Sequence, residues 1–269
     1  MVPDQISIYH YFTKIYMPYF LYQGQLVCGQ EAELEGEEAN HASRSRRLRQ
    51  GEQFEVQDIH PQRFLARVLN KSRNNVKFIV EKVLESPPES ALKLELWQAL
   101  PREKSLEFIL QKGTELGVSR FVLFPGRFTQ GLRQQPKQED FIQRWHRICK
   151  ESCKQSGRLL FPKVSAYLSL DDAFVKNPLQ GEGWMLCTEE QKIQGFPENR
   201  LPRLHLKLLI GPEGGWHQDE IQNAEQRGWK PVGLGPRIMR SETAAVSALS
   251  ILQYVYGDMG QHSQTSSKG

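Results

Sequence analysis

The chain has 269 residues, of which 39% are hydrophobic and 25% charged, an ordinary balance for a globular protein with one large or two medium-sized domains. No run approaches the roughly 18 apolar residues of a membrane span, and the first residues lack the basic and apolar regions of a signal peptide, so we expect a cytoplasmic protein that makes no membrane contact. The net charge of +4 is too mild to identify a nucleic-acid partner, and the scattered cysteines lack the spacing of a zinc site or a disulfide framework, so we expect no metal.

Short strands dominate the first third of the chain. Residues 1–16 show no period or turn chemistry, and we expect them to be a start-site extension or a disordered tail. Alternation and β-branched residues predict strands over 52–58, 63–69 and 75–84, separated by turn signals at 58–62 and 71–75. They predict a small β-barrel domain over residues 17–88, which ends at the Pro/Ser-rich segment 86–90.

Four arginines crowd one short segment of this first domain, namely Arg44, Arg46, Arg47 and Arg49. They could form a solvated helix face, balanced by the acidic residues at 31–38. They could instead contact phosphates, because guanidinium groups pair with phosphate oxygens through two hydrogen bonds. Such contacts would position RNA without reading its sequence.

Strands alternate with helices from residue 89 to about 258. The expected strands cover 92–100, 120–125, 163–167, 184–188, 206–210 and 231–235; the expected helices cover 103–116, 139–156, a short segment from Ser169 or Leu170, a segment after Gly215, and a last segment from Ser241. This alternation predicts an α/β domain with a mostly parallel sheet, followed by a flexible tail over 259–269. Gly113 inside the first helix costs about 1 kcal/mol relative to Ala, so we expect a close contact there.

The stretch 206–254 repeats one unit twice, a strand that runs into a Gly/Pro-rich loop and then a helix. Ligands of parallel sheets bind outside the carboxyl ends of the strands, so both loops should face one ligand. Neither loop matches the G-x-G-x-x-G fingerprint of dinucleotide sites or the Gly-Lys-Ser/Thr of a P-loop. The sequence therefore predicts a different kind of cofactor site.

Two motifs in this stretch carry a resemblance to a known family. Residues 210–215 read Ile-Gly-Pro-Glu-Gly-Gly, and residues 234–244 read Leu-Gly-Pro-Arg-Ile-Met-Arg-Ser-Glu-Thr-Ala. Both resemble the ribosomal RNA uridine-N3 methyltransferase family of the SPOUT superfamily, with Met239 and Ser241 where that family usually has Leu and Thr. The resemblance begins at Met17, which we take as the natural start. It implies a trefoil knot within about 184–256 and a PUA-like, RNA-binding barrel before it.

The resemblance also implies an activity, the transfer of a methyl group from S-adenosylmethionine to N3 of one uridine in 16S ribosomal RNA. The expected partners are ribosomal RNA or the small ribosomal subunit and, since SPOUT enzymes are typically homodimers, a second copy of the chain. Cofactor contacts are expected from Leu186, Cys187, Thr188, Ile210, Gly211, Pro212, Glu213, Gly214, Gly215, Leu234, Gly235, Arg237, Ile238, Met239 and Thr243.

Arg240 and Arg237 are the predicted catalytic cations, because a guanidinium beside the uracil would stabilise the anion formed when N3 loses its proton. Glu242 is the nearest candidate base. Glu242 could instead have a structural role, because an acidic residue in the first turn stabilises a helix, with Ser241 as the N-cap of the last helix.

Three further residues are expected to contact the RNA. Arg127 follows a predicted strand end, while Gln155 and Arg158 stand in a segment that matches a family helix end. On the residues alone, the latter two could equally be an ordinary polar helix terminus.

Two other functions compete with this hypothesis. One is another SPOUT specificity such as ribose 2′-O methylation, and the other is a non-catalytic RNA-binding protein of ribosome assembly. The intact glycine and arginine loops favour an active enzyme.

Overall fold

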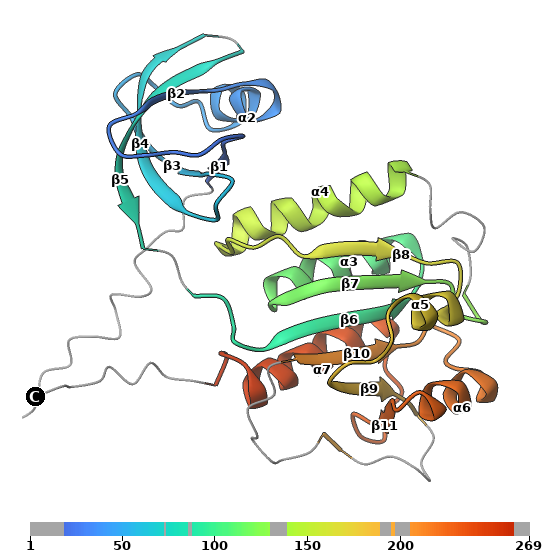
Figure 1. Ribbon diagram of the computed structural model, residues 1–269. Coiled ribbons are helices and arrows are strands. Elements are labelled where there is room, and N and C mark those ends of the chain that lie inside the picture. The colour runs from blue at the N-terminus through green and yellow to red at the C-terminus, as the bar shows by residue number, and fades with distance from the viewer. Residues whose placement is uncertain are drawn as a thin grey trace, which may run out of the picture. The chain divides into compact units, whose positions relative to one another are not determined.

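The structure is a computed structural model that describes residues 19–72, 74–85, 88–129, 139–188, 195–196 and 205–260. The expected N-terminal extension, the start at Met17 and most of the expected C-terminal tail lie outside these residues. The chain folds as two compact units (Figure 1). The N-terminal unit comprises the chain up to Pro88 together with Cys153–Leu159, and the C-terminal unit comprises Glu89–Ser152 and the chain from Leu160 onwards.

The N-terminal unit is built on a five-stranded sheet, sheet A, in the order β1-β3-β4-β5-β2. Its elements are β1 (Phe20–Leu21), β2 (Glu31–Leu34), α2 (Gly36–Asn40), the π-helix η1 (His41–Ser45), β3 (Gln53–Gln57), β4 (Arg63–Lys71) and β5 (Val76–Leu84). The three strands predicted from alternation are therefore present. Phe64, Ala66 and Val68 point inward from β4 and pack with residues of the other strands and with Ala39 of α2.

The C-terminal unit contains a six-stranded sheet, sheet B, in the order β11-β9-β10-β6-β7-β8, and all of its described pairings are parallel. Its strands are β6 (Lys93–Ala99), β7 (Val118–Phe124), β8 (Lys163–Ala166), β9 (Glu182–Leu186), β10 (His205–Ile210) and β11 (Lys230–Val232). Its helices are α3 (Glu103–Glu115), α4 (Glu139–Ser156), α5 (Leu170–Lys176), α6 (Gln218–Gln226) and α7 (Ser241–Tyr256), and the last turn of α4 belongs to the N-terminal unit. The predicted α/β fold with a mostly parallel sheet is confirmed.

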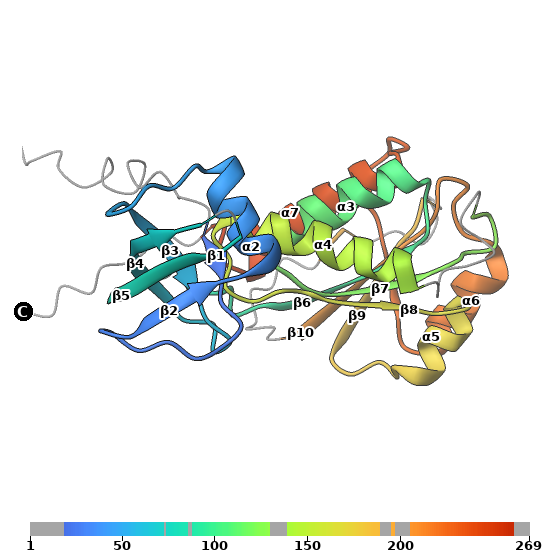
Figure 2. The same ribbon diagram turned by 90° about the horizontal axis from the view of Figure 1, so that it is seen from above.

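Helices cover both faces of sheet B, α3, α4 and α7 on one face and α5 and α6 on the other (Figure 2). Successive side chains of β6 accordingly enter different cores: Leu94 and Leu96 pack under α3 and α7, whereas Trp97 packs with Phe174 of α5. Burial on both faces explains why these strands read as continuous apolar runs. No helix in the described part of the chain is long and apolar enough to cross a membrane.

Close packing explains Gly113. A Cβ atom at this position would lie 2.9 Å from the ring of Phe121 on β7, closer than carbon atoms pack. The expected close contact is confirmed, and it offsets the low helix propensity of glycine.

Candidate cofactor pocket and substrate residues

A pocket of about 310 Å³ lies where β9, β10 and β11 end, within the size range of small-molecule sites. These strands are neighbours and run parallel, so the loops that follow them meet at one edge of sheet B. The loops contribute residues 186–188, 210–216, 234–235 and 237–239 to the lining, and Ile221, Ser241 and Ala244 complete it. Every predicted cofactor residue lines this pocket except Thr243, which is exposed on α7.

The pocket wall is mostly main chain and apolar side chain. The charged side chains among its described lining residues are Glu213 and Arg237. Glu213 accepts a hydrogen bond from the main-chain N of Arg102 (3.0 Å), just before α3. The carboxylate thus links the loop that follows β10, residues 211–216, to the start of α3; this loop is called the glycine loop below. Gly235 adopts a φ of 93°, a left-handed conformation that other residues rarely take.

A buried amide that was not predicted holds two sides of the pocket together. Gln98, at the end of β6, is fully buried and its Nε2 donates to the Oγ of Ser241 (3.0 Å), to the carbonyl of Ala99 (2.7 Å) and, at 3.3 Å, to that of Gly211. The Ser241 hydroxyl in turn donates to the Gly211 carbonyl (2.7 Å). This network joins β6, the glycine loop and the start of α7.

The predicted role of Ser241 as the N-cap of the last helix is wrong. Arg240 occupies the N-cap position of α7, and no side chain caps the helix there. Ser241 is the first helical residue and is buried, and its hydroxyl is engaged by Gly211. The tertiary hydrogen bond has replaced the local capping bond expected from the sequence.

Trp216 is a second lining residue that was not predicted. Its indole Nε1 donates to the carbonyl of Leu186 (2.8 Å), which ties the glycine loop after β10 to the end of β9. A Cβ at Gly211 would lie 3.1 Å from the Trp216 ring. Only glycine therefore fits beneath this ring without displacing it.

The predicted catalytic residues lie at the start of α7 and in the loop before it. Arg237 is exposed and lines the pocket. Arg240 is exposed just before α7 and Glu242 is half-buried in its first turn, and neither lines the pocket. Among the described residues, no hydrogen bond or ion pair engages the side chains of these three.

The N-terminal unit carries the predicted arginine cluster on its surface. Arg44, Arg46, Arg47 and Arg49 are all exposed, and no carboxylate among the described residues pairs with them. Glu38, the last residue of the acidic run before them, pairs with Lys154. Arg47 has a φ of 51°, the single left-handed non-glycine residue in the part of the chain that the structure describes, and such backbone conformations concentrate at functional sites.

The remaining predicted RNA contacts fall in different units. Gln155 is exposed and Arg158 is half-buried, and both belong to the N-terminal unit. Arg127 belongs to the C-terminal unit, where its guanidinium contacts Asp219 (2.8 Å) and the Nδ1 of His217 (2.8 Å). Arg127 is thus already engaged by the capping residues of α6.

Comparison with known proteins identifies the class of this fold and pocket. The RNA methyltransferase domain family matches residues 88–253, and the chain belongs to this family. It is 30% identical to the ribosomal RNA small subunit methyltransferase E of Buchnera aphidicola over 209 residues, 72% of this chain and 76% of that protein.

Solved structures give the same picture. The ribosomal RNA small subunit methyltransferase E of Neisseria gonorrhoeae, bound to S-adenosyl methionine, matches with a TM-score of 0.80 and 26% identity over 90% of this chain and 99% of that one. A Legionella pneumophila structure in complex with bound SAM matches with a TM-score of 0.81 and 30% identity over the same shares.

Proposed function

We propose that the protein uses S-adenosylmethionine to methylate N3 of a uridine in 16S ribosomal RNA. The observation that carries the proposal is the single pocket formed by the three loops, two of which bear the family motifs. Relatives named ribosomal RNA small subunit methyltransferase E support the substrate, and the two structures with this cofactor support its identity. A ribosomal substrate would also place the enzyme in the cytoplasm.

The residues present fit S-adenosylmethionine. Gly235, where a Cβ atom would meet nothing within 4 Å, leaves the main chain open to a purine, and the apolar side chains of Leu234, Ile238 and Met239 offer it a neutral surface. When bound, S-adenosylmethionine supplies the electrophilic methyl group. The two charged lining residues, Glu213 and Arg237, would contact the charged amino-acid end of S-adenosylmethionine or the RNA.

The reactive uracil must lose its N3 proton, and the resulting charge spreads onto its two carbonyl oxygens. Arg237 or Arg240 would hold this charge, since a fixed guanidinium stabilises the anion more than the neutral base. Glu242, in the first turn of α7, is the candidate acceptor of the proton.

Finer features of the family also belong to the proposal. The C-terminal unit would contain a trefoil knot within about 184–256, and sheet A would be a PUA-like, RNA-binding barrel. The protein would act as a homodimer, in support of which Phe108 of α3 and Ile251 and Tyr254 of α7 are exposed apolar residues on two helices that pack together.

Mapping of methylated ribosomal uridines by mass spectrometry, with and without the gene, tests the reaction. Loss of one N3-methyluridine from 16S RNA is expected. Loss of a 2′-O-methyl group would show the other SPOUT specificity, and an unchanged map would favour a non-catalytic assembly role.

Single-turnover assays at saturating RNA test the catalytic residues. Arg240→Ala or Arg237→Ala should bind cofactor and RNA within a few-fold of the wild type, yet react about 10²–10³ times more slowly. Arg227→Ala, which removes an exposed arginine directly after α6 and outside the pocket, is the matched control. Normal turnover by both test variants would assign these arginines to binding alone and direct attention to Glu242.

A further inference from the structure

Phe128 is an aromatic residue that is exposed on a closely bonded turn. The turn, residues 126–129, follows β7, and Phe128 within it is 44% exposed. The main-chain N of Gly126 donates to the Thr129 hydroxyl (2.8 Å), and the main-chain N of Thr129 donates back to the Gly126 carbonyl (3.1 Å). Thr129 is only 4% exposed, so both bonds are shielded from water. They fix the main chain on either side of Phe128.

The start of α6 holds the same turn from a second side. The main-chain N of Arg127 donates to the carboxylate of Glu220 (3.0 Å), and the Arg127 guanidinium donates to Asp219 (2.8 Å). Glu220 and His217 form the capping box of this helix. The Phe128 ring lies 6.0 Å, centre to centre, from the His217 ring. The helix therefore supports the turn that carries the exposed phenylalanine.

The turn also packs directly against the glycine loop of the cofactor pocket. A Cβ atom at Gly214 would lie 2.7 Å from the Cβ of Phe128, and a Cβ atom at Gly126 would lie 3.3 Å from Pro212. Pro212 and Gly214 both line the pocket. Because the strands of sheet B run parallel, β7 ends at the same edge as β9, β10 and β11 (Figure 1). Phe128 is thus a direct neighbour of the pocket wall.

No other exposed Phe, Tyr or Trp residue in the part of the chain that the structure describes has this position. Phe108 belongs to α3 and Tyr254 to α7, and Phe161 lies just before β8, at the edge of sheet B where the strands begin. Phe128 alone among them comes from a loop at the edge that holds the pocket.

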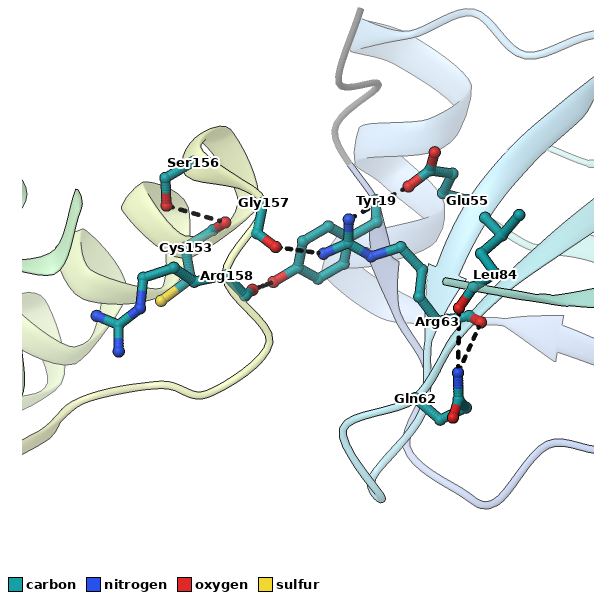
Figure 3. Close-up of polar contacts among 9 residues, drawn as sticks. All are labelled: Tyr19, Glu55, Gln62, Arg63, Leu84, Cys153, Ser156, Gly157 and Arg158. Carbon is teal, nitrogen blue, oxygen red and sulfur yellow. Dashed lines mark hydrogen bonds and ion pairs between the residues drawn. The ribbon is translucent and has the colours of Figure 1, made fainter. Parts of the chain in front are cut away.

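The described aromatic residues of the N-terminal unit are buried or half-buried. The Tyr19 ring, for example, is fully buried, and the guanidinium of Arg63 lies 4.1 Å from its centre (Figure 3). The same guanidinium donates to the carbonyl of Gly157 (2.9 Å). A ring covered in this way has no free face for a planar ligand.

The chemistry of methylation at N3 indicates what would cover the Phe128 ring. N3 of uracil lies on the edge that pairs with another base, so the target uridine must be unpaired when it reacts. Taking a base out of its helix removes the stacking of that base and of its neighbours, which costs free energy. An aromatic side chain on which a freed base stacks recovers part of this cost, and proteins commonly bind single-stranded RNA in this way.

We propose that Phe128 binds the RNA substrate by stacking on an unpaired base beside the cofactor pocket, either the target uracil or a base next to it. The proposal rests on the proposed function and deepens it, because it adds a contact to a base. The arginine cluster of the N-terminal unit would instead contact phosphates, which are the same in every sequence. Phe128 takes no part in the transfer of the proton or the methyl group.

The test measures RNA affinity of the full-length protein, with a fragment of 16S RNA that contains the uridine found by mapping. Phe128→Ala should weaken binding by about 5- to 150-fold, the range for the loss of one stacked base. Phe128→Leu keeps apolar bulk without a flat ring and should lose most of the affinity, whereas Phe128→Tyr should keep it. Phe128→Ala retains the Cβ atom beside Gly214, so cofactor affinity, measured by calorimetry, should not change.

Phe161→Ala is the matched control, because this phenylalanine is similarly exposed (41% against 44%) but lies at the opposite edge of sheet B. It should leave RNA affinity unchanged. Fragments with an abasic residue in place of the target uridine or of either neighbour identify the base that stacks. On the fragment that lacks this base, Phe128→Ala should bind as tightly as the wild type.

Equal RNA affinity in the wild type, Phe128→Ala and Phe128→Leu would overturn the stacking role and leave the proposed function intact. An effect of Phe128→Ala that persists on all three abasic fragments would do the same. So would a change of oligomeric state in Phe128→Ala, measured by sedimentation, because a second copy of the chain would then cover the ring. A wild-type protein that neither binds nor methylates the intact fragment would overturn the proposed function, and with it this proposal.

Discussion

Removal of the Ser241 hydroxyl should weaken cofactor binding through the loop that it holds. In Ser241→Ala, the Gly211 carbonyl and the Gln98 amide each lose one partner, at 2.7 and 3.0 Å. Neither group becomes fully unsatisfied, because Gln98 still reaches the carbonyls of Ala99 and Gly211. With about 0.5–1.5 kcal/mol for each of the two bonds, the loss of stability should be about 1–3 kcal/mol, and the melting temperature should fall by about 2–4 °C per kcal/mol.

The affinity for S-adenosylmethionine should fall by up to about tenfold, because the glycine loop must then be ordered on binding, and 1.4 kcal/mol corresponds to one decade. Titration calorimetry and thermal unfolding measure both quantities. Ser241→Thr keeps the hydroxyl and should retain most of the affinity. Ser250→Ala removes the hydroxyl bond to the Val246 carbonyl on the same helix, away from the pocket, and should affect stability alone. Wild-type cofactor affinity in Ser241→Ala would refute the reasoning.

Three other outcomes are expected. Replacing Arg46 and Arg47 together by Ala should reduce the slope of the logarithm of the RNA binding constant against the logarithm of the salt concentration by up to about two units, and it should leave cofactor affinity unchanged. An unaltered slope would show that both arginines are ordinary surface residues. Gly235→Ala should weaken cofactor binding. The control is Gly29→Ala, at a position far from the pocket loops in the sequence, which has a similar left-handed φ (84° against 93° at Gly235) and likewise has no atom within 4 Å of the added Cβ; it should leave cofactor binding unchanged. Equal effects of the two substitutions would contradict the pocket assignment. Burial lowers the pKa of Lys207 below its usual 10.5, so the unfolded chain binds the additional proton; the free energy of unfolding should rise as the pH increases towards 10.5, and urea unfolding of Lys207→Met should show no such rise.

The sequence predicted well those features that depend on local pattern. Helix α4 begins and ends where its periodicity indicated, and the other predicted strands and helices of sheet B are present with ends shifted by at most three residues. The pocket loops could also be identified, because parallel topology brings the ends of neighbouring strands together whatever the details of packing.

Features that depend on contacts across the chain could not be predicted. Gln98 lies inside an apolar strand and carries no sequence signal, and its role arises from the approach of Gly211 and Ser241, which are more than one hundred residues away. Ser241 looked like a helix cap because local rules describe only local partners. The position of Trp216 directly after the Gly-Gly pair could have suggested that it lines the pocket. Its hydrogen-bond partner, the carbonyl of Leu186 on β9, could not be predicted, because the contact depends on the order of the strands in the sheet.

The membership of Cys153–Leu159 in the N-terminal unit has a consequence for synthesis on the ribosome. All five strands of sheet A have been translated by residue 84, yet the seven residues that take up Arg63 and Glu38 follow roughly 70 residues later. Synthesis proceeds at about 5–20 residues per second, so several seconds pass between translation of the last strand of sheet A and translation of this segment. During this interval the side chains of Arg63 and Glu38 remain hydrated. The N-terminal unit is therefore completed only after Glu89–Ser152 of the C-terminal unit has been translated, and a fragment cut at residue 88 would lack the segment that completes its fold.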